Sequence, residues 1–534
     1  MANYFIKIAT LLISYWLHCG LLQSQSKVLT NQTSIDSFIN DHSASIYDGN
    51  IFVHADSRGQ DPIINLNGLQ HIEQISGSLE ILGTSSLVNL EGLEDLNSVR
   101  SLTIIDNQQL QNVDALNNLT GELITIVIVN NPALDNLNGL NNIRKLSLLA
   151  IESNTSMKSV GSFEELDTIV GNLFIANNDS IVTIDGFNQL MHVGDQFSID
   201  NNNALLSLSG FSAMRNADIE IRIRDNNNLQ FLSGFDQLRQ VRTIDISDNN
   251  NIVELDGFNQ LRLADNILIS DTDDLQDIRG FNALHQITNE LFITDHDALS
   301  NLDAFSSVDS IRQIDIRRCS QLIGLEALSG VQYNLTLNLN SLNRLKSLHG
   351  LEQIEELSSL NLTNLDSLTT ITSLSNLESL RSLSFTHNNE IIHLNGLQNV
   401  TNLEFLTISD NAALSDITTL NSLLSSSLKN VEIVFNPSLS ECSTTLFCEF
   451  LNTDIGQQTT FFTRNATGCS TQDQVLQSCM NDITMMQKEV GISACTDGMD
   501  NDEDGLVDCL DPDCSKVPAC IANCPAEAPA FIKN

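Results

Sequence analysis

The sequence repeats one short pattern at a nearly constant period. A Gly-Leu or Gly-Phe pair, or a close variant, starts at residue 68 and recurs every 23 or 24 residues up to residue 419, giving sixteen starts in register. A fixed period of this length is typical of a solenoid, in which each repeat forms one turn and contacts only its neighbours. The length of the chain therefore does not require several globular domains.

The spacing of apolar residues within one repeat predicts a short strand followed by a return arm. From Leu87 to Val99 they fall on every third position, whereas Leu102 and Ile104 are two apart. A period of two indicates an extended strand, and a period of three indicates short helical or coil turns that fold the chain back. Stacked turns should pair their strands into a parallel sheet on one face.

A polar position follows each strand, and we expect it to be buried. Asn107 occupies this position in the repeat described above. A buried amide can bond backbone groups of its own turn and of the adjoining turn, so the repeats should form an internal ladder. The later ladder asparagines are Asn131, Asn154, Asn178, Asn202, Asn226, Asn249, Asn388, Asn411 and Asn436. Thr272, His296, Cys319, Leu342 and Leu365 interrupt them, and we expect His296 to be a hydrogen-bonded core residue.

The strand pattern Leu-x-Leu-x-x-Asn resembles that of leucine-rich repeats. The Gly-Leu turns and the segments GSLEI (77–81) and GNLFI (171–175) resemble the receptor L-domain branch of that superfamily. The resemblance covers roughly residues 45–440 and implies a mainly β repeat solenoid, with a parallel sheet on one face and short coil or 3-10 return arms. It says little about the ligand.

Changes in composition suggest how the chain is divided. We predict a signal peptide at 1–26, an N-terminal cap at 27–60, a solenoid at 61–440, a cysteine-rich C-terminal cap at 441–480, a linker at 481–494, an acidic cysteine-rich segment at 495–524 and a tail at 525–534. Within the N-terminal cap, GNIFV (49–53) reads as a first, degenerate strand.

The N-terminus has the features of a secretory signal. An apolar stretch runs over 8–22, and the small residues Ser24 and Ser26 place cleavage before Lys27. A membrane anchor is the alternative, although the stretch is short for one. Cys19 as a lipidation site is a further alternative. No later apolar run is long enough to span a membrane, so we expect a secreted or cell-surface protein.

The charge of the chain excludes one class of partner. The formal net charge is −42, with only 25 lysine and arginine residues. Such a field repels nucleic acid and anionic lipid surfaces, since phosphate binding needs basic side chains. We therefore expect a protein or glycan partner and no nucleic acid.

Nine of the eleven cysteines lie between Cys442 and Cys524, which indicates disulfides in an exported protein. The first four, Cys442, Cys448, Cys469 and Cys479, allow three pairings, among which the sequence does not choose. Two short helices are expected, at 444–452 and 471–480. This segment resembles the caps that close extracellular leucine-rich-repeat arrays.

The segment 495–514 holds eight acidic residues and no basic one. Its spacing fits a calcium loop, in which oxygens at positions 1, 3, 5, 7, 9 and 12 converge on Ca²⁺ and a glycine at position 6 permits the turn. The predicted ligands are Asp500, Asp502, Asp504, Leu506 through its backbone carbonyl, Asp508 and Asp511. Aspartate at position 12 resembles thrombospondin type 3 or dockerin loops. A solvated acidic linker is the alternative.

The outward positions of the predicted strands give a candidate ligand face. Arginines are unexpected on one face of so acidic a chain, and phenylalanines could add apolar anchors. The candidate residues are Phe174, Asp200, Arg222, Arg224, Asp245, Phe292, Asp315 and Arg317. A solvated face with charges that serve solubility is the alternative.

These features favour a non-catalytic extracellular or cell-surface binding or adhesion protein with a structural calcium loop. A spacer without a ligand is the first alternative. A calcium-dependent, polysaccharide-active β-solenoid enzyme is the second, because Asp315 beside Arg317 could mimic its site. Such enzymes build clefts from long loops, and here no repeat departs from 23 or 24 residues.

The calcium loop gives a direct prediction. Isothermal titration of an oxidised, refolded 490–524 peptide should show calcium binding with a dissociation constant of roughly 10⁻⁴–10⁻³ M, the range of extracellular modules. The absence of heat at millimolar calcium would contradict the loop.

Overall fold

The fold is described from a computed structural model covering residues 25–56, 61–120, 125–331 and 335–486. Within these residues the chain forms two compact units. The first ends at Leu345 and also holds His349–Ile354, and the second holds Lys346–Leu348 and the residues from Glu355 on.

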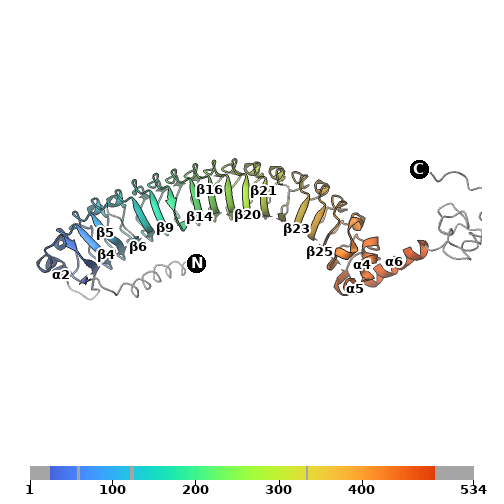
Figure 1. Ribbon diagram of the computed structural model, residues 1–534, viewed down its shortest axis with the longest axis horizontal. Helices are drawn as coiled ribbons and strands as arrows, with labels where there is room; N and C mark the ends of the chain where they lie inside the picture. The colour runs from blue at the N-terminus through green and yellow to red at the C-terminus, as the bar shows by residue number, and fades with distance from the viewer. Residues whose placement is uncertain (1–24, 57–60, 121–124, 332–334, 487–534) are drawn as a thin grey trace, which may run out of the picture. The chain divides into compact units, whose positions relative to one another are not determined.

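The main sheet of the first unit is parallel, and each strand pairs with the strand of the next turn. In Figure 1 these strands lie side by side from β4 to β21. The strands are β1 (Gln25–Leu29), β3 (Gly49–His54), β4 (Gln74–Leu82), β5 (Ser98–Ile105), β6 (Thr125–Val129), β7 (Lys145–Glu152), β9 (Thr168–Ala176), β12 (Gln196–Asp200), β14 (Asn216–Arg224), β16 (Gln240–Ser247), β18 (Leu263–Ser270), β20 (Gln286–Thr294), β21 (Ser310–Arg317) and β22 (Leu335–Asn340). Two short strands, β2 (Ile46–Tyr47) and β11 (His192–Val193), precede β3 and β12 in the chain and pair with β4 and β9. This is the predicted parallel solenoid.

The return arms contain short 3-10 helices and a second set of short parallel strands. The helices are η1 (Asn67–Leu69), η2 (Asp114–Leu116), η3 (Asn138–Leu140), η4 (Asp303–Phe305) and η5 (Glu326–Leu328). In between, β8 (Ser159–Val160), β10 (Thr183–Ile184), β13 (Ser207–Leu208) and β15 (Phe231–Leu232) form one flank sheet, and β17 (Glu254–Leu255) pairs with β19 (Asp277–Ile278). The 3-10 arms follow from the spacing of three in the sequence, whereas these short strands were not predicted.

Two short helices, α2 (Gln32–Asp36) and α3 (Phe38–Asp41), lie at the N-terminal end of the solenoid. The predicted strand at 49–53 is β3, and β1, which was not predicted, pairs with it. Because Gln25 and Ser26 belong to β1, cleavage before Lys27 would shorten this strand by two residues. Gly49 has a φ of +151°, and a Cβ there would lie 1.7 Å from the backbone oxygen of Gln25.

The predicted asparagine ladder is present. The Nδ2 of Asn202 donates to the backbone oxygen of Ile175 in the preceding turn at 3.0 Å and to that of Asp200 in its own turn at 3.1 Å. Its Oδ1 accepts from the backbone N–H of Asn178 at 3.1 Å. The ladder asparagines are fully buried from Asn107 to Asn249. Amides therefore satisfy backbone groups at the point where the strands end.

The ladder position changes its chemistry after Asn249. Both ring nitrogens of His296 lie 3.1 Å from backbone oxygens, those of Thr272 and Ile269, which confirms the prediction of a hydrogen-bonded core histidine. Burial lowers the pKa of His296 and raises the pKa of the Cys319 thiol to about 12. Both ring nitrogens of His296 face backbone oxygens and the Cys319 thiol stays protonated at neutral pH, so neither side chain is poised to act as a ligand or a nucleophile.

One residue in the left-handed conformation precedes each ladder position. In the first unit, from Asp106 to Arg318, φ at these positions lies between 48° and 63°. Asparagine and aspartate adopt this conformation more readily than other side chains. The run Asp225, Asp248, Asp271 and Asp295 thus follows from a backbone requirement.

A stack of phenylalanine rings fills the core of the first unit on the return-arm side. Neighbouring rings lie 5.2–5.5 Å apart, and their planes are within 14° of parallel. The stacked rings are those of Phe163, Phe187, Phe211, Phe235, Phe258, Phe281 and Phe305. They belong to the Gly-Phe pairs and their variants, so the repeat places one ring in each of seven consecutive turns.

The second unit continues the same repeat. Its parallel strands are β23 (Glu356–Thr363), β24 (Ser379–Thr386), β25 (Phe405–Ser409), β26 (Asn430–Val434) and β27 (Thr460–Thr463). Its 3-10 helices are η6 (Thr372–Leu374), η7 (Thr418–Ser422) and η8 (Ser425–Ser427). The ladder asparagines Asn388, Asn411 and Asn436 are fully buried here as well.

The C-terminal cap contains α4 (Thr445–Leu451), α5 (Asp454–Thr459) and α6 (Gln472–Met486). Disulfides join Cys442 to Cys469 and Cys448 to Cys479, which selects one of the three possible pairings. The helices near 444–452 and 471–480 were predicted. Helix α6 runs on to Met486, into the first residues of the segment predicted as a linker at 481–494, and the rest of that segment lies outside the described residues.

The strand pairing and the ladder continue past residue 440, the boundary predicted for the solenoid. Strand β27 lies inside the cap and pairs with β26. Asn465 continues the ladder, because its Oδ1 accepts from the backbone N–H of Asn436 at 2.9 Å. The cap therefore closes the solenoid with one more strand.

No helix among the described residues is long and apolar enough to cross a membrane. The predicted signal peptide, apart from Gln25 and Ser26, lies outside the described residues, and so do the calcium loop and the tail.

The ladder predicts a position-specific effect on stability. Asn202→Ala should lower the free energy of unfolding by about 3 kcal/mol, because it leaves several buried backbone groups without a partner, at about 1–3 kcal/mol each. Asn203→Ala, the same change at the exposed neighbouring residue, should have an effect within about 0.5 kcal/mol. Urea unfolding of the two variants measures both effects. Equal losses would contradict the role of the ladder.

Candidate functional site

The sheet face of the first unit is formed by the outward side chains of its main strands. On β14, Ile221 and Ile223 are buried in the core, whereas Glu220, Arg222 and Arg224 point outward. Strand register places the outward side chains in rows across the strands. One row holds Phe174, Ser198, Arg222, Asp245, Leu268, Phe292 and Asp315, and the next holds Ala176, Asp200, Arg224, Ser247, Ser270, Thr294 and Arg317. All eight candidate residues lie in these two rows.

A group of ion pairs, which we call the central cluster, lies on β12, β14 and β16. Nη2 of Arg222 donates to Oε1 of Glu220 at 2.7 Å, and Arg224 donates to Asp245. The Oγ of Ser247 donates to the same aspartate at 2.5 Å. Asp245 points outward, yet only 3% of its side chain is exposed, because the arginines cover it.

In the central cluster, the Asp200 carboxylate is the one with an oxygen that lacks a hydrogen-bond partner among the described residues. Ser198 donates to its Oδ2, but among the described residues its buried Oδ1 has no hydrogen-bond partner. Burial raises the pKa of Asp200 to about 6, and the bond from Ser198 and the charges of Arg222 and Arg224 oppose this rise. The buried Nε atoms of both arginines also lack a hydrogen-bond partner in the described structure.

A second cluster lies on β20 and β21. Nε of Arg317 donates to Asp315 at 2.6 Å, and its guanidinium carbon lies 5.7 Å from the centroid of the Phe292 ring. Only 3% of the Asp315 side chain is exposed. The hydrogen bond to Asp315 raises the pKa of Arg317. Arg318 pairs with Asp295 at the end of these strands.

An apolar region adjoins the central cluster on β5, β6, β7 and β9. Its outward residues include Ile105, Val127, Val129 and Phe174. Strand register adds Ala150 beside them. Glu152 on β7 lies in the same outward row as Val129 and Ala176, so the face is mainly but not wholly apolar up to β9 and is charged from β12 on.

Sequence reasoning identified the charged residues but missed Ser198 and Ser247, which hold the two central aspartates. Each serine is two positions from the aspartate it binds, on the same side of the same strand. The rule that residues i and i+2 share a strand face could have found both.

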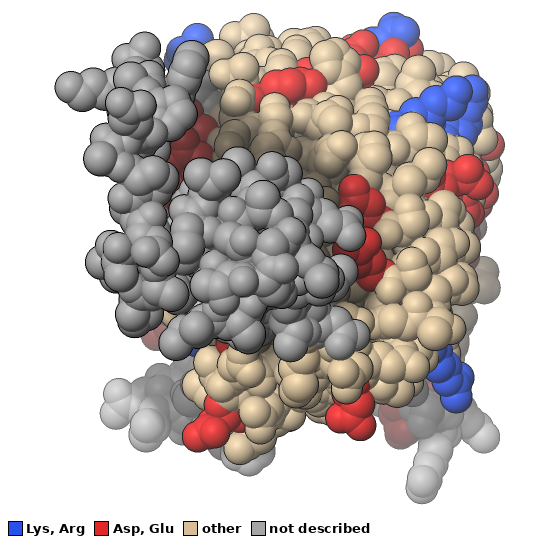
Figure 2. Space-filling view, turned by 90° about the vertical axis from the view of Figure 1, so that its right-hand side faces the viewer, with Lys and Arg blue, Asp and Glu red and all other residues tan. Residues whose placement is uncertain are grey.

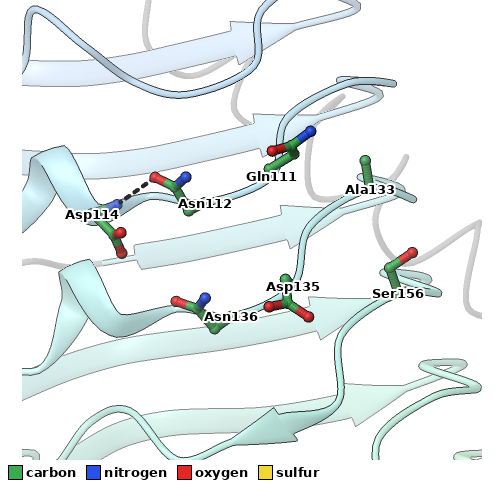
Figure 3. Close-up of a pocket in the computed structure, with 7 residues that line it drawn as sticks. All are labelled: Gln111, Asn112, Asp114, Ala133, Asp135, Asn136 and Ser156. Carbon is green, nitrogen blue, oxygen red and sulfur yellow. Dashed lines mark hydrogen bonds between the residues drawn. The ribbon is translucent and has the colours of Figure 1, made fainter.

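The described residues contain no group of three or more His, Cys, Asp or Glu side chains arranged to hold a metal ion. A shallow polar depression of about 470 Å³ lies on the return arms, lined by Gln111, Asn112, Asp114, Ala133, Asp135, Asn136 and Ser156 (Figure 3). In it, Oδ1 of Asn112 accepts from the backbone N–H of Asp114 at 3.3 Å. Its walls are polar apart from Ala133 and would not exclude water, so we assign it no chemistry.

Acidic side chains outnumber basic ones along the chain, with 67 Asp and Glu residues against 25 Lys and Arg residues. Figure 2 shows carboxylate side chains dispersed over the visible end of the molecule, with few basic ones among them. The arginines of the two clusters are therefore unusual, because they gather on one face of a chain in which basic residues are few.

Comparison with known proteins gives only weak similarity. No family model matches the chain, and no curated protein sequence matches it. A crystal structure of a leucine-rich repeat protein from Bacteroides ovatus aligns over 57% of this chain and 78% of its own, with 12% identity and a TM-score of 0.35. The structure of a leucine-rich repeat protein from Leptospira interrogans aligns over 86% of this chain and 97% of its own, with 14% identity and a TM-score of 0.26.

The fold is identified by the internal geometry of the turns. The turns share one parallel strand, two buried apolar residues two apart that are most often leucine or isoleucine, and an inward ladder residue three positions after the second of them. The fold is a leucine-rich-repeat solenoid. Details of the L-domain branch stay a resemblance.

The environment of Asp200 predicts how the stability of this leucine-rich-repeat solenoid depends on pH. The pKa of Asp200 in the folded chain lies above that of an unfolded aspartate, so ionisation of Asp200 destabilises the fold. The destabilisation is absent near pH 4, grows as the pH rises, and is complete above about pH 6. Asp200→Asn should therefore stabilise the protein at pH 7.5 by roughly 2 kcal/mol, with little effect at pH 4.

Thermal unfolding of the wild type and the variant at both pH values measures this effect. Asp245→Asn is the matched control, because Asp245 is as buried but is paired with Arg224 and Ser247, and its loss should destabilise the protein. A stabilising effect of Asp200→Asn that did not change with pH would contradict the assignment.

Proposed function

We propose that this solenoid is a non-catalytic, exported binding or adhesion protein that docks a protein or glycan partner on its sheet face. The observation that carries the proposal is the fixed arrangement of outward side chains in the two clusters. Asp245 and Asp315 are held by arginines and are almost fully covered. Side chains that are already immobilised lose little entropy when a partner binds.

The composition of the face supports a macromolecular partner. Apolar side chains from Ile105 to Phe174 adjoin the central cluster, and the ring of Phe292 lies beneath Arg317. Apolar or aromatic anchors next to ordered charges are common at the centres of interfaces.

The predicted export signal and the two cap disulfides support a place outside the cell. Disulfides persist in oxidising compartments and close small caps that lack a large core. We further propose that the loop at 500–511 binds calcium and holds the C-terminal segment in one conformation.

One observation favours the spacer as a second candidate. The charges of Arg222, Arg224 and Arg317 are already paired within the sheet face. A face that needs only solubility and internal order would have the same pairs. Screening glycan and protein arrays with the full chain, with and without calcium, separates the two candidates, because a spacer binds nothing.

The face proposal predicts the effect of reversing one charge. Arg317→Glu places a carboxylate beside Asp315 and should weaken binding of a partner found on the arrays at least tenfold. Arg279→Glu is the control, because Arg279 forms similar exposed ion pairs with Glu254 and Asp277 on a return arm. Surface plasmon resonance measures both affinities.

Arg222→Glu tests the central cluster in the same way and should also weaken binding. Thermal unfolding of each variant shows whether a loss of binding reflects a loss of folding. Unchanged affinity in folded Arg222→Glu and Arg317→Glu proteins would count against this face.

A further inference from the structure

The sheet face of the second unit differs in chemistry from that of the first. Inward residues of β23 and β24, such as Leu360 and Phe385, are buried, and the side chains between them point outward. Strand register aligns the outward residues of β23, β24 and β25 in three rows. None of these nine positions carries a charge, and eight are polar: Ser359, Asn361, Thr363, Ser382, Ser384, Thr386, Thr407 and Ser409. We call these eight residues the neutral patch.

The neutral patch presents closely spaced hydrogen-bonding groups. Adjacent strands are about 4.8 Å apart, and the hydroxyl oxygens of Thr363 and Thr386 lie 3.0 Å from each other on two of them. A hydroxyl donates one hydrogen bond and can accept two, so this surface can meet both donors and acceptors of a ligand. On β14 of the first unit, by contrast, the outward residues Glu220, Arg222 and Arg224 are all charged.

Three exposed phenylalanines adjoin the neutral patch on the side of the C-terminal cap. Phe405 is the remaining outward residue of β25 and is 41% exposed. Phe461 on β27 is 55% exposed and stands opposite Glu432 of β26. Phe435, the residue directly after β26, is 39% exposed. From the strand spacing and the rise per residue, the Cα atoms of Phe405 and Phe461 are about 12 Å apart, so these rings form separate apolar contacts.

The fold does not explain why Phe435 is a phenylalanine. It occupies the left-handed position before the ladder residue Asn436, with a φ of 59°, which is unfavourable for a bulky side chain. The other non-glycine residues at this position are aspartate, asparagine, serine, histidine and arginine. The guanidinium carbon of Arg464 lies 4.8 Å from the centroid of the ring and holds it in place. An exposed, ordered ring in an unfavourable backbone conformation indicates a binding role.

The composition of this surface favours a carbohydrate over a protein partner. Serine and threonine, which make up seven of the eight residues of the neutral patch, are under-represented among the residues that dominate protein interfaces. A sugar ring has a face of C–H groups that can stack on an aromatic ring, and hydroxyl groups that need both donors and acceptors. The phenylalanines and the neutral patch supply these two kinds of contact side by side.

The charges around the patch favour an uncharged carbohydrate. Glu432 is exposed beside Phe461, and the whole chain has a net charge of −42, so both the local and the overall charge repel an anionic polymer. Arg381 and Lys429, near the starts of β24 and β26, are both paired with Glu404, at 3.1 and 2.9 Å. These two cations are thus already neutralised in part by the protein itself.

We propose that the sheet face of the second unit binds a neutral polysaccharide. Phe405, Phe435 and Phe461 stack against its sugar rings, and the neutral patch bonds its hydroxyl groups. The distance between the phenylalanines requires a chain of several sugars. This site is separate from the two clusters of the first unit, and it needs none of their arginines.

Affinity electrophoresis of the full chain tests the proposal. Each native gel contains one neutral polysaccharide, which is hydroxyethylcellulose, laminarin, xylan or galactomannan, and a reference gel contains none. The negative charge of the protein drives its migration, so slower migration reports binding. We expect at least one neutral polysaccharide to slow the wild type, whereas the anionic polysaccharide alginate should not. No retardation by any neutral polysaccharide, or stronger retardation by alginate, would overturn the proposal.

Two substitutions test the phenylalanines. Phe461→Ala should raise the dissociation constant for the retarding polysaccharide at least fivefold. Phe435→Asn should have the same effect without lowering the melting temperature, because asparagine readily adopts the left-handed conformation. Phe231→Ala is the matched control, because Phe231 is 62% exposed but lies on a return arm of the first unit, and its loss should leave binding unchanged.

Two further variants locate the site. Ser384→Asp places a charge between Asn361 and Thr407 in the neutral patch and should raise the dissociation constant at least tenfold. Arg317→Glu should leave polysaccharide binding unchanged, so that a failure of this site and a failure of the first unit's face can be told apart. Unchanged binding in folded Phe461→Ala and Phe435→Asn proteins, or an equal loss in Phe231→Ala, would overturn the assignment.

Discussion

The hydrogen bonds at the ends of the strands are the constraint on which the solenoid depends. Each strand must stop at the same place and turn into the interior, which leaves backbone groups without strand partners. The side chain of Asn202 bonds backbone atoms of its own turn and of the preceding turn. This single side chain therefore keeps neighbouring turns in register, and register in turn places the outward rows of the sheet face.

The same turn explains much of the acidity of the face. The residue before the ladder position is left-handed, and aspartate or asparagine adopts that conformation at low cost. Asp225, Asp248, Asp271 and Asp295 occupy it for a backbone reason, and a ligand need not be invoked for them. Asp200 and Asp245 lie within regular strands, where no such requirement exists. Their placement is thus the more informative sign of a function.

The sequence predicts the structural features that recur once in every repeat, but it predicts few of the features that occur only once in the chain. The strands, the ladder from Asn107 to Asn249 and the outward direction of all eight face residues follow from spacing alone. Asn465 could not be assigned to the ladder, because it lies 29 residues after Asn436 and breaks the period. The disulfide pairing and the contacts of Asp200 depend on how elements meet in space, and the sequence does not encode these as a spacing.

The near-constant length of the turns limits how such a chain can change over time. One residue inserted into a strand would exchange inward and outward side chains across the rest of that strand and would move polar groups into the core. A whole added or deleted turn of 23 or 24 residues leaves every neighbour with the contacts it already had. The length of this protein can therefore vary by duplication in whole-turn steps, and length differences among its relatives should be multiples of one turn.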